Sequence, residues 1–195
     1  TYPRFYEYGG SIFGTYYKVI IVAPRYAINN DNLSADIKAR LGSIDQLFST
    51  YRPDSELMKL NQAPINQPYT INKEVIKLIQ LSKSLQQTLG PVWDPTIVPV
   101  SKKYGFETVP GITGAVIGLQ HIDILNDKQV IKHAAISLDF SSIAKGYAVD
   151  ELSKLVNKLS IKGSYIDIGG EIRTTGHKTG LKPWGIGIQS PTNTS

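Results

Sequence analysis

Cysteine is missing from this chain of 195 residues. Without thiols the protein can form no disulfide, no thiolate metal site and no cysteine nucleophile. Long apolar runs are missing too, because stretches such as 19–23 are far shorter than the about 20 residues that cross a bilayer. Neither a G-x-G-x-x-G nor a Walker-type glycine pattern occurs, which excludes the usual dinucleotide-binding and P-loop sites.

Charge of one sign is not concentrated in any stretch. The 21 Lys and Arg outnumber the 16 Asp and Glu, giving a net charge of +5, which favours anionic ligands in general. The basic residues are scattered and lack the interleaved aromatics typical of nucleic-acid-binding proteins. The length suffices for one sizeable core. We therefore expect a single domain over residues 1–195 that binds no nucleic acid.

Apolar periodicity predicts several helices and strands. Strands are expected over 11–22, 164–174 and 184–189, a hairpin over 122–125 and 130–139, and helices over 30–48, 55–60, 72–89 and 143–159. Ser55 and Asn72 are the expected N-caps of two of these helices, and Gly90 is expected to end the second. Strands and helices follow one another without a βαβ rhythm, which predicts an α+β fold.

The most informative stretch is 138–150. A strand delivers Asp139 to a turn of small residues, and a helix follows at once. The free N–H groups of the first helical turn, together with the helix dipole, form a ready anion site. Lys145 is expected in that turn, where a cation is unfavourable for the helix and a phosphate would explain it. The alternative is that Ser141 or Ser142 caps the helix and Lys145 is solvated.

Paired glycines, Gly169 and Gly170, interrupt an apolar strand pattern. They weaken a strand unless something approaches the backbone closely. A phosphate or an adenine would qualify, and a β-bulge is the alternative that the residues alone favour.

Two aromatic side chains are candidates for stacking on a planar ligand. Trp93 lies beside Asp94, which the following proline holds extended. Tyr51 lies at a loop before a short helix. Core packing is the more common fate of such rings, so both interpretations stay open. The three histidines share no ligand-like spacing and are given no role.

A succession of short segments runs along the chain: Phe13-Gly14-Thr15, Ser49-Thr50-Tyr51, Ser55-Glu56-Leu57, Leu60-Asn61, Trp93-Asp94-Pro95-Thr96, Gly105-Phe106, Asp139 through Asp150, Ile168-Gly169-Gly170-Glu171, and Pro183-Trp184 with Ile188 and Pro191. Taken together and in this order, these segments resemble the ApbE family of FAD:protein FMN transferases. The resemblance implies an ApbE-like, T-fold-related domain with a mixed or antiparallel sheet and packed helices. The stretch from Ala144 to Asp150 is its most specific part.

The resemblance also implies a reaction. A Thr or Ser hydroxyl of an acceptor protein would attack the FMN-side phosphorus of FAD, with magnesium present, and AMP would leave. By position, the residues implied to bind FAD are Phe13, Tyr51, Val92, Trp93, Asp94, Asp139, Lys145, Gly169 and Gly170. Ser142 falls where a backbone carbonyl binds magnesium. Phe13 replaces the usual Met and Trp93 the commoner Phe, and no catalytic residue is assigned.

One departure from the family pattern lies at the end of the chain. Family members continue beyond the Trp184 segment into a histidine-containing segment and an acidic motif that supplies metal ligands. Neither is present here, so we expect a C-terminally truncated chain with poor metal binding and slow transfer, a natural short form being the alternative. Two other functions stay open: an FAD-binding module without transferase activity, and an FAD pyrophosphatase that yields FMN and AMP.

The resemblance further implies a location and a partner. Such enzymes lie in the periplasm or on the outer face of the bacterial inner membrane, often as lipoproteins. Their acceptors include subunits of redox-driven ion pumps.

Overall fold

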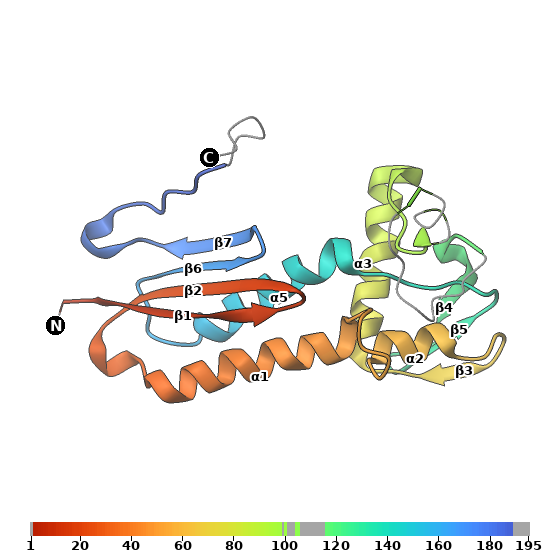
Figure 1. Ribbon diagram of the computed structural model, residues 1–195, viewed down its shortest axis with the longest axis horizontal. Coiled ribbons are helices and arrows are strands. Elements are labelled where there is room, and N and C mark those ends of the chain that lie inside the picture. The colour runs from red at the N-terminus through yellow and green to blue at the C-terminus, as the bar shows by residue number, and fades with distance from the viewer. Residues whose placement is uncertain (1, 99, 101–103, 106–115, 189–195) are drawn as a thin grey trace. The chain divides into compact units, whose positions relative to one another are not determined.

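The protein is shown in Figure 1 as a computed structural model, which describes residues 2–98, 100, 104–105 and 116–188. The chain divides into two compact units. Unit 1 comprises Thr1–Arg40 and Gly146–Ser195, and unit 2 comprises Leu41–Lys145. Both mix helices with antiparallel strands, which confirms the α+β prediction. A single domain over 1–195 stays a prediction, because compact units defined by contacts can belong to one domain.

Unit 1 is built on a four-stranded antiparallel sheet. Its strands follow the order β1-β2-β6-β7 and are β1 (Arg4–Ile12), β2 (Thr15–Ala23), β6 (Gly163–Ile168) and β7 (Glu171–Gly176). The first part of α1 (Asn30–Phe48) and most of α5 (Ser141–Val156) run along this sheet (Figure 1). Short 3₁₀ turns, η1 (Arg25–Ala27) and η4 (Thr179–Leu181), follow β2 and β7.

The core of unit 1 follows from strand alternation. Val19 and Ile21 are fully buried on one face of β2, and Val19 pairs in register with the equally buried Ile166. Leu33 and Ile37 of α1 and Leu152 of α5 are buried as well. Burying β-branched and leucine side chains on one face stabilises each element by about 1.5–3 kcal/mol per side chain.

Each of two segments predicted as a single strand instead forms a turn with strands on both sides, which is a hairpin. The chain reverses at Phe13 and Gly14, whose φ values of 53° and 72° suit a tight turn between β1 and β2. It reverses again at Gly169 and Gly170, with φ of 56° and 96°, between β6 and β7. The predictions over 11–22 and 164–174 are therefore wrong at these turns, because apolar alternation continues across a two-residue turn and hides it.

The strand predicted over 184–189 is also wrong where it is described. Residues 182–188 have no regular structure, and residue 189 lies outside the described residues. Trp184 instead donates its indole N–H to the carbonyl of Thr175 at 3.1 Å, and its ring lies 5.8 Å from that of Tyr165. Side-chain contacts therefore hold this segment, which an alternation pattern cannot reveal.

Unit 2 contains helices and a smaller sheet. Its three-stranded sheet has the order β3-β5-β4, with β3 (Pro68–Thr70), β4 (Ile122–Ile124) and β5 (Gln129–Lys132). The rest of α1 joins α2 (Glu56–Gln62), α3 (Lys73–Leu89), η2 (Gly90–Val92) and η3 (Leu119–His121). Phe48 and Phe140 meet edge to face at 6.0 Å in its core.

Local sequence signals in unit 2 are confirmed. The Ser55 hydroxyl accepts from the Met58 N–H at 3.1 Å, and the Asn72 side chain accepts from the Glu74 N–H at 2.9 Å. Gly90 ends α3 with a φ of 70°. The predicted hairpin is present with shorter strands, since residues 133–139 form no strand.

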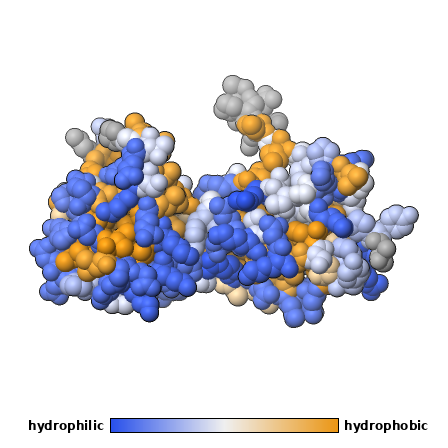
Figure 2. Space-filling model, turned by 180° about the vertical axis from the view of Figure 1, so that it is seen from behind, coloured by the Kyte–Doolittle hydropathy of each residue, from blue (hydrophilic) through white to orange (hydrophobic). Residues whose placement is uncertain are grey.

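Seen from behind, hydrophilic side chains cover much of the visible surface of each unit, with apolar patches between them (Figure 2). No helix within the described part of the chain is long and apolar enough to cross a membrane. Two residues of the family-like segments, Phe106 and Pro191, lie outside the described residues.

Candidate functional site in two parts

Two of the predicted segments come together in unit 2. The backbone N–H of Asp139 donates to the carbonyl of Pro95 at 2.8 Å. The indole N–H of Trp93 donates to the Ser142 hydroxyl at 3.1 Å. The loop after α3 therefore lies against the start of α5, although 49 positions separate Trp93 from Ser142 in the sequence. This is the juxtaposition that a common ligand site would require.

Asp139 caps α5. Its Oδ1 accepts from the Ser141 backbone N–H at 2.8 Å and from the Ser141 hydroxyl at 2.5 Å. The alternative that Ser141 or Ser142 supplies the cap is therefore wrong, because the Asp139 carboxylate does so. The helix accordingly begins at Ser141, two residues earlier than predicted.

At this helix start, where an anion site was expected, protein oxygens already accept hydrogen bonds from most of the free backbone N–H groups. The N–H groups of Ile143 and Ala144 both donate to the carbonyl of Phe140, at 2.9 and 2.8 Å. Asp139 takes the N–H of Ser141. Among the described residues, only the first-turn N–H of Ser142 has no recorded acceptor. A phosphate bound here would therefore lie next to the Asp139 carboxylate.

Lys145 was predicted in the first turn of the helix but lies just beyond that turn. Because α5 begins at Ser141, Lys145 is its fifth residue and opens the second turn. Its side chain is half-buried. The unfavourable interaction with the helix dipole is weaker there than in the first turn, since the effect falls off within about one turn.

The Asp94 carboxylate accepts the hydrogen bonds that hold the loop after α3. Its Oδ1 accepts from the N–H and hydroxyl of Thr96 at 2.8 and 2.6 Å, and its Oδ2 accepts from Gln86 Nε2 at 2.7 Å. The Thr96 hydroxyl accepts in turn from the Gly118 N–H at 2.6 Å. With both oxygens engaged, Asp94 ties the loop to α3 and thereby positions the neighbouring Trp93.

Tyr51 and Val92 present their side chains to solvent, at 80% and 82% exposure. The core-packing alternative for Tyr51 is therefore wrong. The loop that carries Tyr51 is tightly closed, since the Ser55 hydroxyl donates to the carbonyl of Ser49 at 2.7 Å and the Ser49 hydroxyl accepts from the Tyr51 N–H at 3.2 Å. An exposed ring on an ordered loop can stack on a ligand at low entropic cost.

Arg52 braces the same loop. Its guanidinium lies 3.6 Å from Asp45 and 3.4 Å from Asp54. The hydrogen bond from Arg52 lowers the pKa of Asp54 below its ordinary value of 3.8. Asp54 is therefore ionised at neutral pH.

In unit 1 the remaining predicted residues lie at two neighbouring turns. The N–H of Gly169 donates to the carbonyl of Tyr16 at 3.0 Å, close to the Phe13 turn. A Cβ on Gly169 would lie 2.7 Å from Thr15 Cγ2, so a side chain there would clash. Gly169 and Gly170 thus form a hairpin turn pressed against β2, and the β-bulge interpretation is wrong.

Asp167 lies beside the turn at Gly169 and Gly170, and the sequence pattern assigned it no role. Its carboxylate is buried and accepts from the Gly170 N–H at 2.9 Å and from the hydroxyls of Tyr16 and Tyr165 at 3.3 Å each. The negative charge of Asp167 raises the pKa of Tyr16, while burial and then Asp167 raise that of Tyr165. The i, i+2 spacing of Tyr165 and Asp167 was the available signal.

A magnesium site does not follow from the described residues alone. They contain no group of three or more His, Asp or Glu side chains that could hold a metal. The carboxylates of Asp94 and Asp139 are engaged in hydrogen bonds. The Ser142 carbonyl lies inside α5, where helix geometry directs it to a backbone donor and leaves only its second lone pair.

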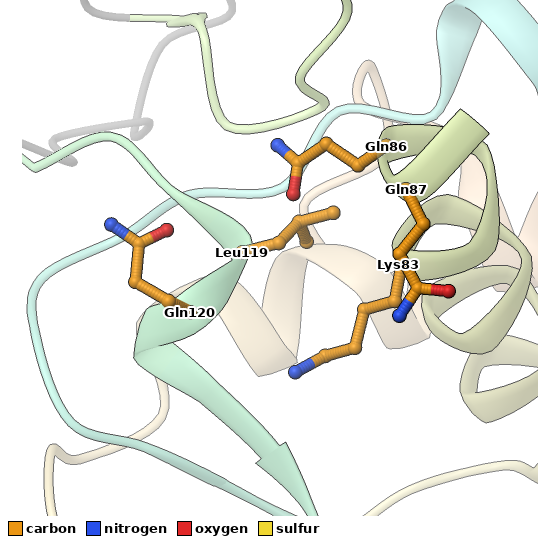
Figure 3. Close-up of a pocket in the computed structure, with 5 residues that line it drawn as sticks. All are labelled: Lys83, Gln86, Gln87, Leu119 and Gln120. Carbon is orange, nitrogen blue, oxygen red and sulfur yellow. The ribbon is translucent and has the colours of Figure 1, made fainter. Parts of the chain in front are cut away.

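A shallow cavity of about 280 Å³ lies between α3 and the η3 turn (Figure 3). It is lined by Lys83, Gln86, Gln87, Leu119 and Gln120. Lys83 Nζ donates to the carbonyl of Ile122 at 2.6 Å, and Gln86 holds Asp94, so both serve the fold. No motif in the sequence indicates this cavity.

Comparisons with known proteins find similarity over nearly the whole chain. A curated FAD:protein FMN transferase of Klebsiella pneumoniae is 28% identical, covering 94% of this chain and 57% of the relative. That of Haemophilus influenzae is 30% identical, covering 95% and 58%. A solved structure, the flavin transferase ApbE from Vibrio cholerae, matches with a TM-score of 0.87 at 26% identity, covering 97% of this chain and 65% of that chain.

This chain therefore spans little more than half the length of these curated relatives. The family model described as "ApbE family" matches residues 13–195, which is nearly the whole chain. It includes both turns of unit 1 and the paired segments of unit 2. On these grounds the chain belongs to the ApbE family.

Proposed function

We propose that the protein takes part in FAD:protein FMN transfer, the activity that the names of its curated relatives state. The observation that carries the proposal is the contact between Trp93 and Ser142, which brings the predicted flavin-binding loop to the start of α5. Membership of the ApbE family supplies the reaction class.

In the proposed reaction, an acceptor Thr or Ser hydroxyl oxygen bonds to the FMN-side phosphorus of FAD. The bond from that phosphorus to the bridging oxygen breaks, AMP leaves and the hydroxyl proton passes to solvent or a base. Phosphoryl-type transfer depends mainly on positioning and charge neutralisation. Tyr51 and Trp93 would stack on planar rings of FAD, and Lys145 would neutralise phosphate charge.

The other predicted residues would line the flavin and its phosphates. Val92 is exposed beside Trp93, Asp139 holds the start of α5, and Phe13 lies at a turn next to Gly169 and Gly170. We extend the proposal to magnesium dependence on family grounds. Since the described residues hold no acidic cluster, we derive no step through the metal.

The decisive experiment is incubation with FAD, magnesium and an acceptor protein, read by intact mass. We expect the acceptor to gain the mass of one FMN phosphoester and AMP to appear in equal amount. A parallel reaction with a full-length ApbE relative shows that the acceptor is competent. AMP without a mass gain would point to FAD hydrolysis.

A binding module without transferase activity is the second candidate. The lack of an acidic or histidine cluster among the described residues favours it. Tight FAD binding with neither AMP release nor acceptor modification would establish this function. Absence of FAD binding would exclude FMN transfer, FAD hydrolysis and the binding module alike.

We further propose, from family membership, that the protein acts in the periplasm or on the outer face of the bacterial inner membrane, held by a lipid anchor. Its acceptor would be a subunit of a redox-driven ion pump. Fractionation of the native host, with mass analysis of flavinylated membrane proteins, tests both. Recovery in the cytoplasmic fraction would reject the location.

A further inference from the structure

One end of unit 1 gathers cationic side chains. The sheet register places the start of β1 beside the end of β2, and the end of β2 beside the start of β6 and the end of β7. The N-terminus, η1 and η4 lie at this same end, on the left of Figure 1. We call it the basic end and define it by Arg4, Arg25, Lys158, Lys162, Lys178 and Lys182.

Within the described part of the chain, these six cations lack an acidic partner. Among the described residues, no ion pair to Asp or Glu is recorded for any of the six, whereas Lys18, Arg40 and Arg173 elsewhere in unit 1 are all paired. Lys178 lies 5.6 Å over the ring of Trp184. An excess of unpaired positive charge on one surface attracts a surface of opposite charge.

Exposed apolar side chains lie among these cations. Tyr2, Phe5, Tyr26 and Leu181 are exposed to 95%, 52%, 80% and 82%. Leu181 is unusual, because its φ of 59° is left-handed and costs energy for a residue with a branched side chain. The η4 turn therefore presents a leucine to solvent at an energetic cost to the fold.

Cations mixed with exposed tyrosine, phenylalanine and leucine match the chemistry of an anionic lipid surface. Lys and Arg attract acidic headgroups, while aromatic and aliphatic side chains enter the boundary between headgroups and acyl chains. An acidic protein would pair with the cations but would bury less of the apolar surface of Leu181 and the aromatic rings. We propose that the basic end of unit 1 binds directly to anionic phospholipid membranes.

The test is flotation of the purified chain with vesicles of phosphatidylglycerol and phosphatidylcholine, against vesicles of phosphatidylcholine alone. We expect binding only to the anionic vesicles, weakening with salt. The triple variant Lys158→Gln, Lys162→Gln, Lys182→Gln should bind at least about tenfold more weakly. The control triple Lys73→Gln, Lys77→Gln, Lys128→Gln removes the same charge from exposed lysines of unit 2 and should change binding less than about threefold.

Leu181→Gly separates the apolar contribution from charge. Glycine tolerates the left-handed φ, so thermal unfolding should be unchanged or improved. Vesicle binding should nevertheless fall several-fold. Equal losses in the two lysine triples, no loss in Leu181→Gly, or binding of soluble polyglutamate as tight as that of the vesicles would each overturn the proposal.

Discussion

Tyr51 and Trp93 are both aromatic side chains of unit 2, but their surroundings differ. Tyr51 is exposed on a loop closed by Ser49 and Ser55, whereas Trp93 is half-buried and donates its indole N–H to Ser142. The first ring is available for stacking without any rearrangement. The second is held in place by Ser142, which lies at the start of α5, just before the most family-specific segment.

Tyr51→Ala should weaken FAD binding by about 1 kcal/mol or more, because stacking on the ring is lost. Thermal stability should hardly change, since the ring is exposed. Tyr26→Ala is a matched control, equally exposed at 80% but in unit 1. Isothermal titration with FAD measures both, and an unchanged dissociation constant for Tyr51→Ala would exclude the stacking role.

The hydrogen bond between Trp93 and Ser142 can be measured by a double-mutant cycle. Trp93→Phe keeps an aromatic ring and removes the donor, and Ser142→Ala removes the acceptor. We expect a coupling of about 0.5–1.5 kcal/mol in the free energy of FAD binding. Additive losses would mean that the two side chains act independently.

At the scale of elements, Asn61 joins α2 to the segment that leads into α5. Its Oδ1 accepts from the N–H of Leu138 at 2.8 Å and its Nδ2 donates to the carbonyl of Leu138 at 2.9 Å. The backbone carbonyl of Asn61 accepts from Lys132, whose pKa burial lowers. Asn61 thus fixes the residue immediately before Asp139.

Asn61→Leu should lower the free energy of unfolding by about 2–4 kcal/mol, because it leaves two polar backbone groups of the buried Leu138 without partners. Asn61→Asp keeps an acceptor for the Leu138 N–H but sets a carboxylate oxygen against the Leu138 carbonyl, so it should also lower the free energy of unfolding. Urea unfolding of the two variants gives the comparison. Equal stability of Asn61→Leu and the wild type would contradict the role.

At the scale of the whole molecule, acid stability should depend on a contact between the two long helices within unit 1. Glu151 of α5 lies 2.6 Å from Arg40 of α1 and 2.6 Å from Lys154. Burial alone would raise the pKa of Glu151, but the hydrogen bonds from Lys154 and Arg40 outweigh it and lower the pKa below 4.5.

A carboxylate with a lowered folded pKa contributes stability above its unfolded pKa and loses it as pH falls through the folded value. Stability should therefore decline below about pH 4.5, and Glu151→Gln should remove part of that decline. Urea unfolding at pH 6 and pH 3.5 checks this. An identical pH dependence in Glu151→Gln would show that other carboxyl groups carry it.

The sequence by itself determined features that depend on a few neighbouring residues. Ser55 and Asn72 cap helices because a side-chain oxygen two or three residues before a backbone N–H suffices. Gly90 ends α3 because only a residue without Cβ adopts its φ readily. The ordered succession of local motifs also carried the family resemblance.

Only the tertiary structure decided which distant groups share a partner. Asp139 proved to be the cap of α5, Asp94 the anchor of the Trp93 loop, and Asp167 the acceptor for two tyrosines on different strands. Strand register and loop packing set these contacts, and the apolar periodicity of a single segment predicts neither of them. The same register brings six lysines and arginines that are scattered in the sequence to one end of unit 1.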